Sequence, residues 1–476
     1  MNNRRLSQKF FILFAVLTLL SACASPASPT INPTSVPTEL PPTTEPITEP
    51  TTEPTAEPTT ELPEEVVLEV AIESAGYGLD LYQEIARDFE ALHPGVTVNL
   101  WGVPEIWNQL QPRFIAGDTP DLVAAIQLID HAALMTEGQI MPLNDLLNSP
   151  AVGQPEKKFV DTVVSGMLEG GKRDGNYYLF PWNAVTYGIF YNEDMFAEHG
   201  WKIPQTWSEL YDLCDNVEAE EIACIAFPGV WPEYFTLTSW WDLIERIGGR
   251  EAQLNMENLE PGAWNSDVVL EANKLIQELP ARGFFQADWE GQDHTVAQTL
   301  FVTGGAALNF NGTWLEAEMS SITPEDFRMG FFPTPSVQGG KGDGTNLRVG
   351  SDWFFIPSAA KNPELAGEFL KFIFSVDNAR KFVGTTQSLS PIIGSTEGVD
   401  ISYSLSTTMK AMEDASSVRP WYWQVNYFGF YDLLATEVMG ELLRQEITPQ
   451  EMADKLEALA DEIRSDDSIT KVRIED

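Results

Sequence analysis

Hydrophobic residues after position 63 follow two periods in turn. Residues 64–73 (EEVVLEVAIE) are rich in β-branched side chains and predict a strand. Residues 81–92 carry Leu, Ile, Phe and Leu at helical spacing, and a His-Pro-Gly break follows at 93–95. Residues 96–100 then alternate between apolar and polar, which is the period of a strand. This strand–helix–strand order favours a right-handed crossover within a parallel sheet.

The same alternation continues along the chain. Apolar residues at helical spacing lie at 106–114, and strand patterns follow at 121–125 and 178–192. Residues 206–209 (TWSE) form a capping box, which predicts the start of a helix. A body of roughly 410 residues is too long for one small core. We therefore expect an α/β fold with two lobes.

The first 23 residues have the pattern of an export signal. Three basic residues precede an apolar run at 10–20, which is too short to span a bilayer. The run closes with Leu20-Ser21-Ala22-Cys23, which resembles a bacterial lipobox, where the cysteine is acylated and becomes the new N-terminus. Residues 1–23 are thus predicted to be a lipoprotein signal peptide, with Cys23 as the lipid anchor. The alternative is an ordinary signal peptide with an incidental cysteine.

Residues 24–63 are rich in proline, threonine and glutamate. Thr-Glu-Pro recurs at 44–46, 48–50 and 52–54. Proline at this period rules out a helix, because each one removes a helix hydrogen bond. The composition predicts a disordered, extended tether between a membrane and the folded body.

Charge and cysteine content narrow the classes of partner and cofactor. The chain has 71 acidic and 28 basic residues, a net charge of -43 that disfavours nucleic acid and anionic ligands. Cys214 and Cys224 can form a disulfide in an exported protein, and two buried free thiols are the alternative. The four histidines are scattered, and we found no metal-binding or phosphate-binding motif. We therefore expect no metal and no cofactor.

Candidate ligand contacts lie in the loops that follow the predicted strands. In open α/β sheets, ligands bind beyond the carboxyl ends of the strands. The loops are 74–78, 126–130, 182–183, 229–234, 311–314 and 351–353, and four of these six carry a tryptophan. Several also carry an amide or a carboxylate. Aromatic faces cover the apolar side of a sugar ring while polar side chains hold its hydroxyls, so these loops favour a neutral polyol as ligand.

A set of ordered motifs then points to a family. They are 117–121 (GDTPD), 174–178 (DGNYY), 190–192 (FYN), 200–210 (GWKIPQTWSEL), 301–307 (FVTGGAA), 311–314 (NGTW), 332–335 (FPTP) and 362–366 (NPELA). In this order they resemble the extracellular solute-binding proteins of ABC importers, in the carbohydrate-binding branch that includes maltose-binding protein. The resemblance covers about residues 66–464.

The resemblance implies a two-lobed periplasmic-binding-protein-like (type II) fold with a hinge and an interlobe ligand cleft. The chain would cross between lobes near 183–186, 331–334 and 388–392. Lobe 1 would then hold residues 66–183 and 333–388, and lobe 2 residues 184–332 and 389–476.

The resemblance also implies ligand-binding residues. Trp314 of the Asn-Gly-x-Trp turn, Tyr234, and Trp421 and Trp423 of a late aromatic cluster match stacking positions of the family. Three further sets complete the prediction, and these are Asp352 and Trp353 in the 350–353 loop, Gln127 after the Pro-Asp strand, and Trp182 and Asn183 from the loop survey. The resemblance disfavours maltose itself. The charged and aromatic contacts that maltose-binding protein has after the Pro-Asp strand are replaced around Gln127, and the family glutamate on the first crossover is replaced by Val185 or a neighbour.

These observations predict a receptor without catalytic activity. It would be lipid-anchored on the outer side of the cell membrane, bind a carbohydrate as a monomer, and deliver it to the permease subunits of an ABC transporter. Two alternatives remain open at this point. One is a binder of a non-sugar solute such as a polyamine, since carboxylates with aromatic rings also suit cations. The other is a lipid-anchored glycoside hydrolase, which would use a pair of carboxylates.

Overall fold

The computed structural model describes residues 65–126, 129–421 and 423–474. The predicted signal peptide (1–23) with Cys23, the predicted tether (24–63) and the candidate contact Gln127 lie outside the described residues. Within the described ranges, no helix is long and apolar enough to cross a membrane. The same residues contain no group of His, Cys, Asp and Glu side chains arranged to hold a metal ion.

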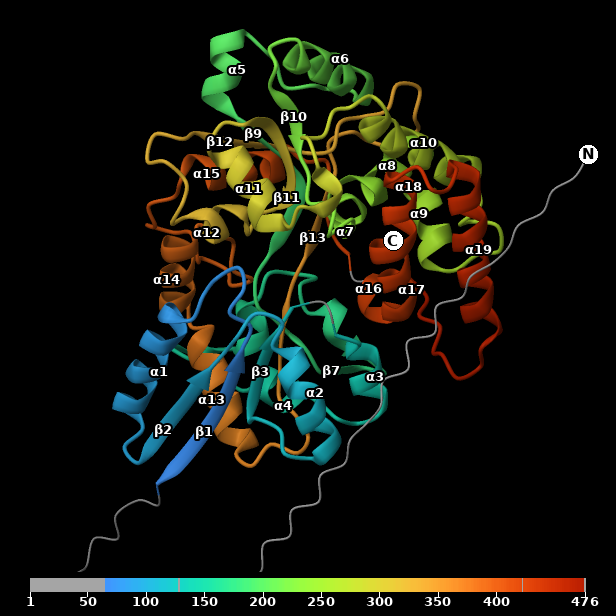
Figure 1. The fold of residues 1–476 in the computed structure, drawn as a ribbon. Helices are drawn as coiled ribbons and strands as arrows, with labels where there is room; N and C mark the ends of the chain where they lie inside the picture. Colours follow the sequence, from blue (N-terminus) through green and yellow to red (C-terminus); the bar gives the residue numbers. More distant parts are fainter. Residues whose placement is uncertain (1–64, 127–128, 422, 475–476) are drawn as a thin grey trace, which may run out of the picture. The chain divides into compact units, whose positions relative to one another are not determined.

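The first sheet has five strands in the order β2-β1-β3-β14-β8. Figure 1 labels β2, β1 and β3, which lie side by side. The strands are β1 (Val66–Ile72), β2 (Val96–Trp101), β3 (Leu122–Ala125), β8 (Phe180–Pro181) and β14 (Trp353–Phe355). β1 pairs in parallel with β2 and with β3, while β14 runs antiparallel to β3 and to β8. Helix α1 (Asp80–Leu92) connects β1 to β2, so the predicted strand–helix–strand unit is confirmed.

Helix α1 forms because its apolar side chains recur on one face. Leu81, Tyr82, Ile85, Ala86 and Phe89 are all buried on the helix. They join the same hydrophobic cluster as the inward-facing residues of β1 and β3. Burial of such side chains contributes about 1.5–3 kcal/mol each, which holds the helix on the sheet. The ends of β1, β2 and β3 are thereby brought to one edge.

The second sheet is built around β9. Its order is β10-β11-β9-β13-β15, and β12 also pairs with β9. The strands are β9 (Val185–Asn192), β10 (Ala223–Ala226), β11 (Ala306–Gly312), β12 (Met329–Phe332), β13 (Leu347–Gly350) and β15 (Val418–Pro420). All eight residues of β9 are buried, as expected for a central strand covered on both faces.

Helices cover both sheets. Before β9 and in the segment after β14, the helices are α1, α2 (Trp107–Ala116), α3 (His131–Thr136), α4 (Asn144–Asn148), α13 (Pro363–Ile373) and α14 (Val376–Thr386). The others are α5 (Glu193–His199), α6 (Trp207–Glu218), α7 (Glu233–Phe235), α8 (Trp241–Gly248), α9 (Arg250–Glu257), α10 (Asp267–Ala281), α11 (His294–Val302), α12 (Leu315–Met319), α15 (Tyr403–Asp414), α16 (Trp423–Asn426), α17 (Phe428–Asp432), α18 (Met439–Leu443) and α19 (Pro449–Ser465). Two short β-hairpins, β4–β5 (Pro150–Ala151 with Gln154–Lys158) and β6–β7 (Lys172–Arg173 with Asn176–Tyr177), complete the strands.

The chain changes sheets three times, between β8 and β9, between β13 and β14, and between β14 and β15. The first change lies at residues 182–184, between the end of β8 and the start of β9. The second falls at 351–352, later than the expected crossing near 331–334, because β13 pairs with β9 and stays in the second sheet. A bridge between Ala184 and Leu389 brings the third expected crossing beside the first.

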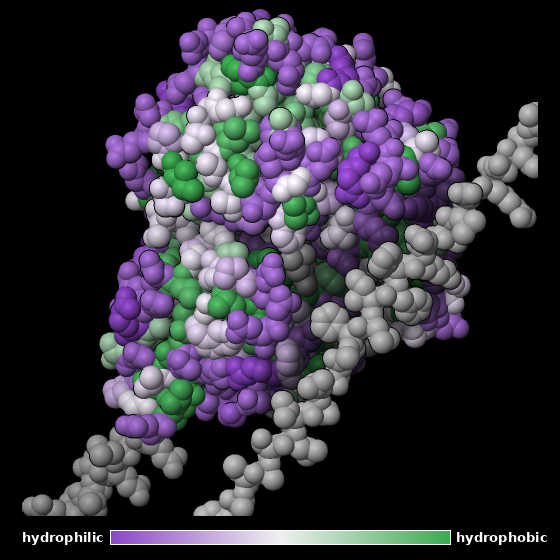
Figure 2. Space-filling model, in the orientation of Figure 1, coloured by the Kyte–Doolittle hydropathy of each residue, from purple (hydrophilic) through white to green (hydrophobic). Residues whose placement is uncertain are grey.

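On the face drawn in Figure 2, hydrophilic residues predominate and hydrophobic residues form small, separated groups.

The predicted capping box is present, since the Thr206 hydroxyl accepts from Glu209 N and the Glu209 carboxylate accepts from Thr206 N. It begins α6, which carries the first of the two cysteines. The structure joins Cys214 on α6 to Cys224 on β10 in a disulfide.

We expect the Cys214→Ala/Cys224→Ala variant to lose about 2–3 kcal/mol of unfolding free energy, because the bond closes a short loop of the unfolded chain. Both sulfurs are fully buried, so the alanines leave small cavities that add to the loss. Denaturant titration of the oxidised wild type, the reduced wild type and the variant measures the effect. Equal midpoints for all three would show that the bond does not stabilise the fold.

Candidate functional site

A cavity of about 700 Å³ lies where the edges of the two sheets meet. From the first sheet it is lined by the loops that directly follow β1, β2 and β3, at 74–78, 104–105 and 126. From the second sheet it is lined by β9 and by the segments that follow β10 and β11. The carboxyl ends of the parallel strands therefore face the cavity, which is the usual position of a ligand site in an α/β fold. Its volume suits a small-molecule ligand.

Aromatic rings make up much of the lining. They come from several separate segments of the chain, namely Tyr77, Trp182, Tyr187, Trp231, Tyr234, Trp314 and Tyr431. Such rings offer flat apolar surfaces of the kind that cover the C–H face of a sugar.

Trp314 lies at the start of α12, immediately after β11. Its ring contacts Tyr187 edge to face, with centroids 6.0 Å apart, and Tyr234 in the same manner at 6.2 Å. The two tyrosines are buried, whereas Trp314 stays partly exposed and lines the cavity. The tyrosines thus fix the orientation of a ring that remains accessible to a ligand.

Trp182 and Asn183 have different positions at the crossing from β8 to β9. Trp182 lines the cavity, but its indole donates to the Tyr82 hydroxyl and the side chain is 1% exposed, so most of it belongs to the core of the first sheet. Asn183 is fully buried and is not part of the lining. Its amide donates to Tyr77 Oη at 3.1 Å and to Asp352 Oδ2 at 2.8 Å. Asn183 therefore orients two lining residues.

Asp352 and Trp353 are adjacent in sequence, and only Asp352 lines the cavity. Successive side chains of an extended segment point to opposite sides, so the carboxylate and the indole diverge. Trp353 is fully buried among the apolar residues on the other face of the first sheet, including Phe355 and Ala125. The prediction that Trp353 contacts ligand is therefore not supported.

Trp421 and Trp423 also lie in the hydrophobic interior. Trp423 packs on Trp241 and Trp264 at centroid distances of 5.6 and 5.0 Å, and Trp421 packs on Trp241 at 5.5 Å. The two candidates are 2% exposed or less. The structure removes both from the candidate stacking rings, because they complete an aromatic core instead.

The lining also contains carboxylates, namely Glu105, Glu233, Glu318 and Asp352. Among the described residues that line the cavity, none is a lysine or an arginine. Burial, and after it the neighbouring Asp432 carboxylate, raise the pKa of Glu233 to about 7. Glu318 accepts from Gln298 Nε2 at 2.9 Å and lies 3.6 Å from His294 Nε2. The cavity is thus acidic as well as aromatic.

Several lining residues were not among the candidates from the sequence. Tyr77 and Trp231 lie in two of the surveyed loops, so their positions after strands were the available signal. Tyr187 lies within β9 and Tyr431 within α17, and their positions in the sequence are typical of ordinary core residues. No local pattern distinguishes these two tyrosines from their buried neighbours.

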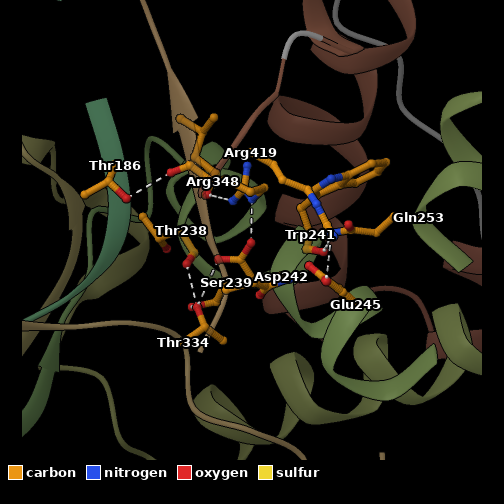
Figure 3. Close-up of polar contacts among 12 residues, drawn as sticks. Thr186, Thr238, Ser239, Trp241, Asp242, Glu245, Gln253, Thr334, Arg348 and Arg419 are labelled. Carbon is orange, nitrogen blue, oxygen red and sulfur yellow. Dashed lines mark hydrogen bonds and ion pairs between the residues drawn. The ribbon is translucent and has the colours of Figure 1, made fainter. Parts of the chain in front are cut away.

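A buried ion pair holds β13 just before it reaches Asp352. Arg348 Nε donates to Asp242 Oδ1 at 2.5 Å, and both side chains are 5% exposed (Figure 3). The guanidinium also lies over the rings of Tyr187 and Trp421, at 5.2 and 4.5 Å from their centroids.

Polar groups around this ion pair connect it to β9 and to the segment after β12. Thr186 Oγ1 donates to the Arg348 carbonyl at 2.9 Å, and Thr334 Oγ1 lies 3.4 Å from Asp242 Oδ2 (Figure 3). The network thereby connects β13, which leads to Asp352, with β9, which carries Tyr187, and with α8, which carries Asp242.

Comparisons with known proteins agree with this architecture. The chain is 26% identical over 408 residues to the diacetylchitobiose binding protein NgcE of Streptomyces coelicolor, which covers 84% of this chain and 85% of the relative. It is 25% identical over 308 residues to the multiple sugar-binding protein of Streptococcus mutans, covering 63% and 69% of the two chains.

Solved structures show the same fold. A chitin oligosaccharide binding protein superposes with a TM-score of 0.72 at 23% identity, covering 84% of this chain and 98% of the other. The raffinose complex of the binding protein RafE superposes with a TM-score of 0.67 at 22% identity, covering 83% and 99%. These likenesses confirm the α/β, two-lobed type II fold expected from the sequence.

The family profile described as bacterial extracellular solute-binding protein matches residues 75–380. This span includes the crossings at 182–184 and 351–352 and most of the segments that line the cavity. The chain belongs to the bacterial extracellular solute-binding proteins.

Proposed function

We propose that this protein is a lipid-anchored receptor that captures an oligosaccharide and delivers it to the permease of an ABC transporter. The observation that carries the proposal is the 700 Å³ cavity, whose lining combines accessible aromatic rings with hydrogen-bonding carboxylates. Two relatives are named for binding diacetylchitobiose and multiple sugars, which supports a carbohydrate ligand. The large cavity favours several sugar units over one.

We propose that ligand binding closes two lobes around this cavity. Lobe 1 would hold residues 66–183 and 353–388, with β13 assigned to lobe 2 because it pairs with β9. Lobe 2 would hold residues 184–350 and 389–476, and the crossings at 182–184, 351–352 and near 389 would form the hinge. A ligand favours the closed form only by binding it more tightly than the open form.

A thermal-shift and calorimetry panel on the body from residue 64 onward tests the proposed function. The panel contains monosaccharides, neutral oligosaccharides, amino-sugar oligosaccharides and polyamines. A sugar that stabilises the protein and is recovered unchanged supports the receptor. Release of reducing ends over time would favour a glycoside hydrolase, and a response to polyamines alone would favour a cation receptor.

The anchor has its own test. We expect the Cys23→Ser variant to appear in the soluble fraction of the expressing cells, because it lacks the thiol that the lipidation requires. The readout is the distribution of full-length protein between washed membranes and the soluble fraction, with ligand affinity unchanged. Retention of the variant on membranes would contradict the anchor without affecting the binding proposal.

A further inference from the structure

The carboxylates of the cavity differ in whether the protein already supplies them with a donor. Asp352 accepts from Asn183, and Glu318 accepts from Gln298. Glu105, at the exposed rim, accepts from Asn108 Nδ2 at 3.0 Å. Glu233 makes no side-chain hydrogen bond or ion pair with any residue that the structure describes, although it lines the cavity.

A second polar group without a partner lies beside Glu233. The Tyr431 side chain is 3% exposed and lines the same cavity. Its hydroxyl has no hydrogen-bond partner among the described residues. Burial first, and then the charge of Glu233, raise the pKa of this hydroxyl. Both side chains line the same cavity, and α7, which carries Glu233, contacts residues 433–438, which directly follow α17. A polar group that lines a cavity and has no partner among the described residues can form hydrogen bonds with a ligand or with water there.

The surroundings of Glu233 disfavour the ionised form of its carboxyl group when no cation is bound. Burial and the carboxylate of Asp432 both raise its pKa. An ionised carboxylate that is removed from water needs a charged or strongly donating partner. Lysine and arginine are absent from the described lining residues, so the protein does not provide a cation there.

We propose that Glu233 binds a protonated amine of the ligand. The ligand is then an oligosaccharide with at least one free amino group. The inference rests on the proposed function and specifies the class of its sugar. The ammonium group would donate to Glu233 and to Tyr431 Oη, while a sugar ring of the same ligand would cover Trp314, which lines the same cavity. The aromatic lining adds attraction for the cation.

Charge at long range acts in the same direction. The chain carries a net charge of -43, and a strongly acidic protein raises the local concentration of cationic ligands around itself. Neutral sugars gain nothing from this field. An amine-bearing sugar therefore benefits from the overall charge and from the local site together.

The experiment compares two ligand series that share one backbone. Glucosamine oligomers of two to six units carry free amines, and the fully N-acetylated oligomers of the same lengths do not. Calorimetry at pH 6.5 measures the affinity of both series for the wild type, for Glu233→Gln and for Glu437→Gln. Glu437 is an exposed residue outside the lining, so the control removes the same charge without touching the cavity.

We expect the wild type to bind the free-amine series about tenfold or more tightly than the N-acetylated series. Glu233→Gln should weaken the free-amine series by roughly 30-fold while changing the N-acetylated series less than threefold, because only the charged pair is lost. Glu437→Gln should leave both series within twofold of the wild type.

Two results overturn the inference in distinguishable ways. Tight binding of N-acetylated or other neutral sugars, with equal losses for both series in Glu233→Gln, would show that Glu233 accepts from a neutral donor, and the proposed function would stand. Binding of no sugar from this pair of series or from the wider panel would overturn the amine inference together with the proposed function.

Discussion

Replacing Asp242 with leucine is expected to reduce the free energy of unfolding by about 3–5 kcal/mol, among the largest effects of any single substitution. The change leaves Arg348 charged and buried without its carboxylate. It also removes the negative charge that offsets the burial of Arg246, a side chain that is 1% exposed. Denaturant titration followed by tryptophan fluorescence measures the loss.

Two matched variants show whether the charge pair causes this loss. The double variant Asp242→Leu/Arg348→Met should regain part of the lost stability, because it no longer contains the unpaired charge of Arg348, while Arg246 still lacks the Asp242 charge. Asp414→Asn breaks the Lys410–Asp414 pair, whose side chains are 72% and 66% exposed, and should leave the denaturation midpoint close to that of the wild type. A loss of the same size in the single and double Asp242 variants would show that the unpaired charge of Arg348 does not cause it.

Replacing Trp314 with alanine is expected to weaken ligand binding by about 100-fold, because a central aromatic anchor commonly contributes several kcal/mol to an interface. The ring is partly exposed and held by Tyr187 and Tyr234, so its removal opens the cavity and leaves most of the core in place. Calorimetry with the best sugar of the panel measures the affinity, and circular dichroism checks the fold.

Trp201→Ala is the matched control for this prediction. Trp201 is also partly exposed, but it packs on Phe196 and His199 and is not part of the cavity lining. We expect this variant to lose some stability while it binds the sugar as the wild type does. Affinity that is unchanged in Trp314→Ala, or lowered equally in both variants, would contradict the position assigned to the ligand.

Part of the cavity lining could be predicted from the loops that directly follow the predicted strands, for a physical reason. Parallel strands end at one edge of a sheet, so residues that directly follow them converge whatever their distance in sequence. Trp182, Tyr234, Trp314 and Asp352 all lie in loops selected in this way, and all four line the cavity. The convergence depends only on strand order and direction, which the hydrophobic pattern and the family motifs already indicated.

The burial of three tryptophans could not be predicted from their local sequence. Trp353 directly follows Asp352, which lines the cavity, but its own side chain points to the opposite side of the extended segment and is fully buried. Trp421 and Trp423 pack on Trp241 and Trp264, which lie more than 150 residues earlier in the chain. The local sequence does not show whether a tryptophan ring is buried in the core or contacts a ligand, because this depends on which distant residues surround the ring.

The sequence alone determined the α/β class, the order of the elements, the family and the loops that carry the chemistry. These properties follow from hydrophobic periods, capping residues and motifs, all of which are local along the chain. Only the tertiary structure decided which rings line the cavity, that Tyr187 and Tyr431 join them, and that Glu233 has no hydrogen-bond partner among the residues that the structure describes. Those outcomes depend on contacts between segments far apart in the chain, since burial and pairing are properties of the packed molecule.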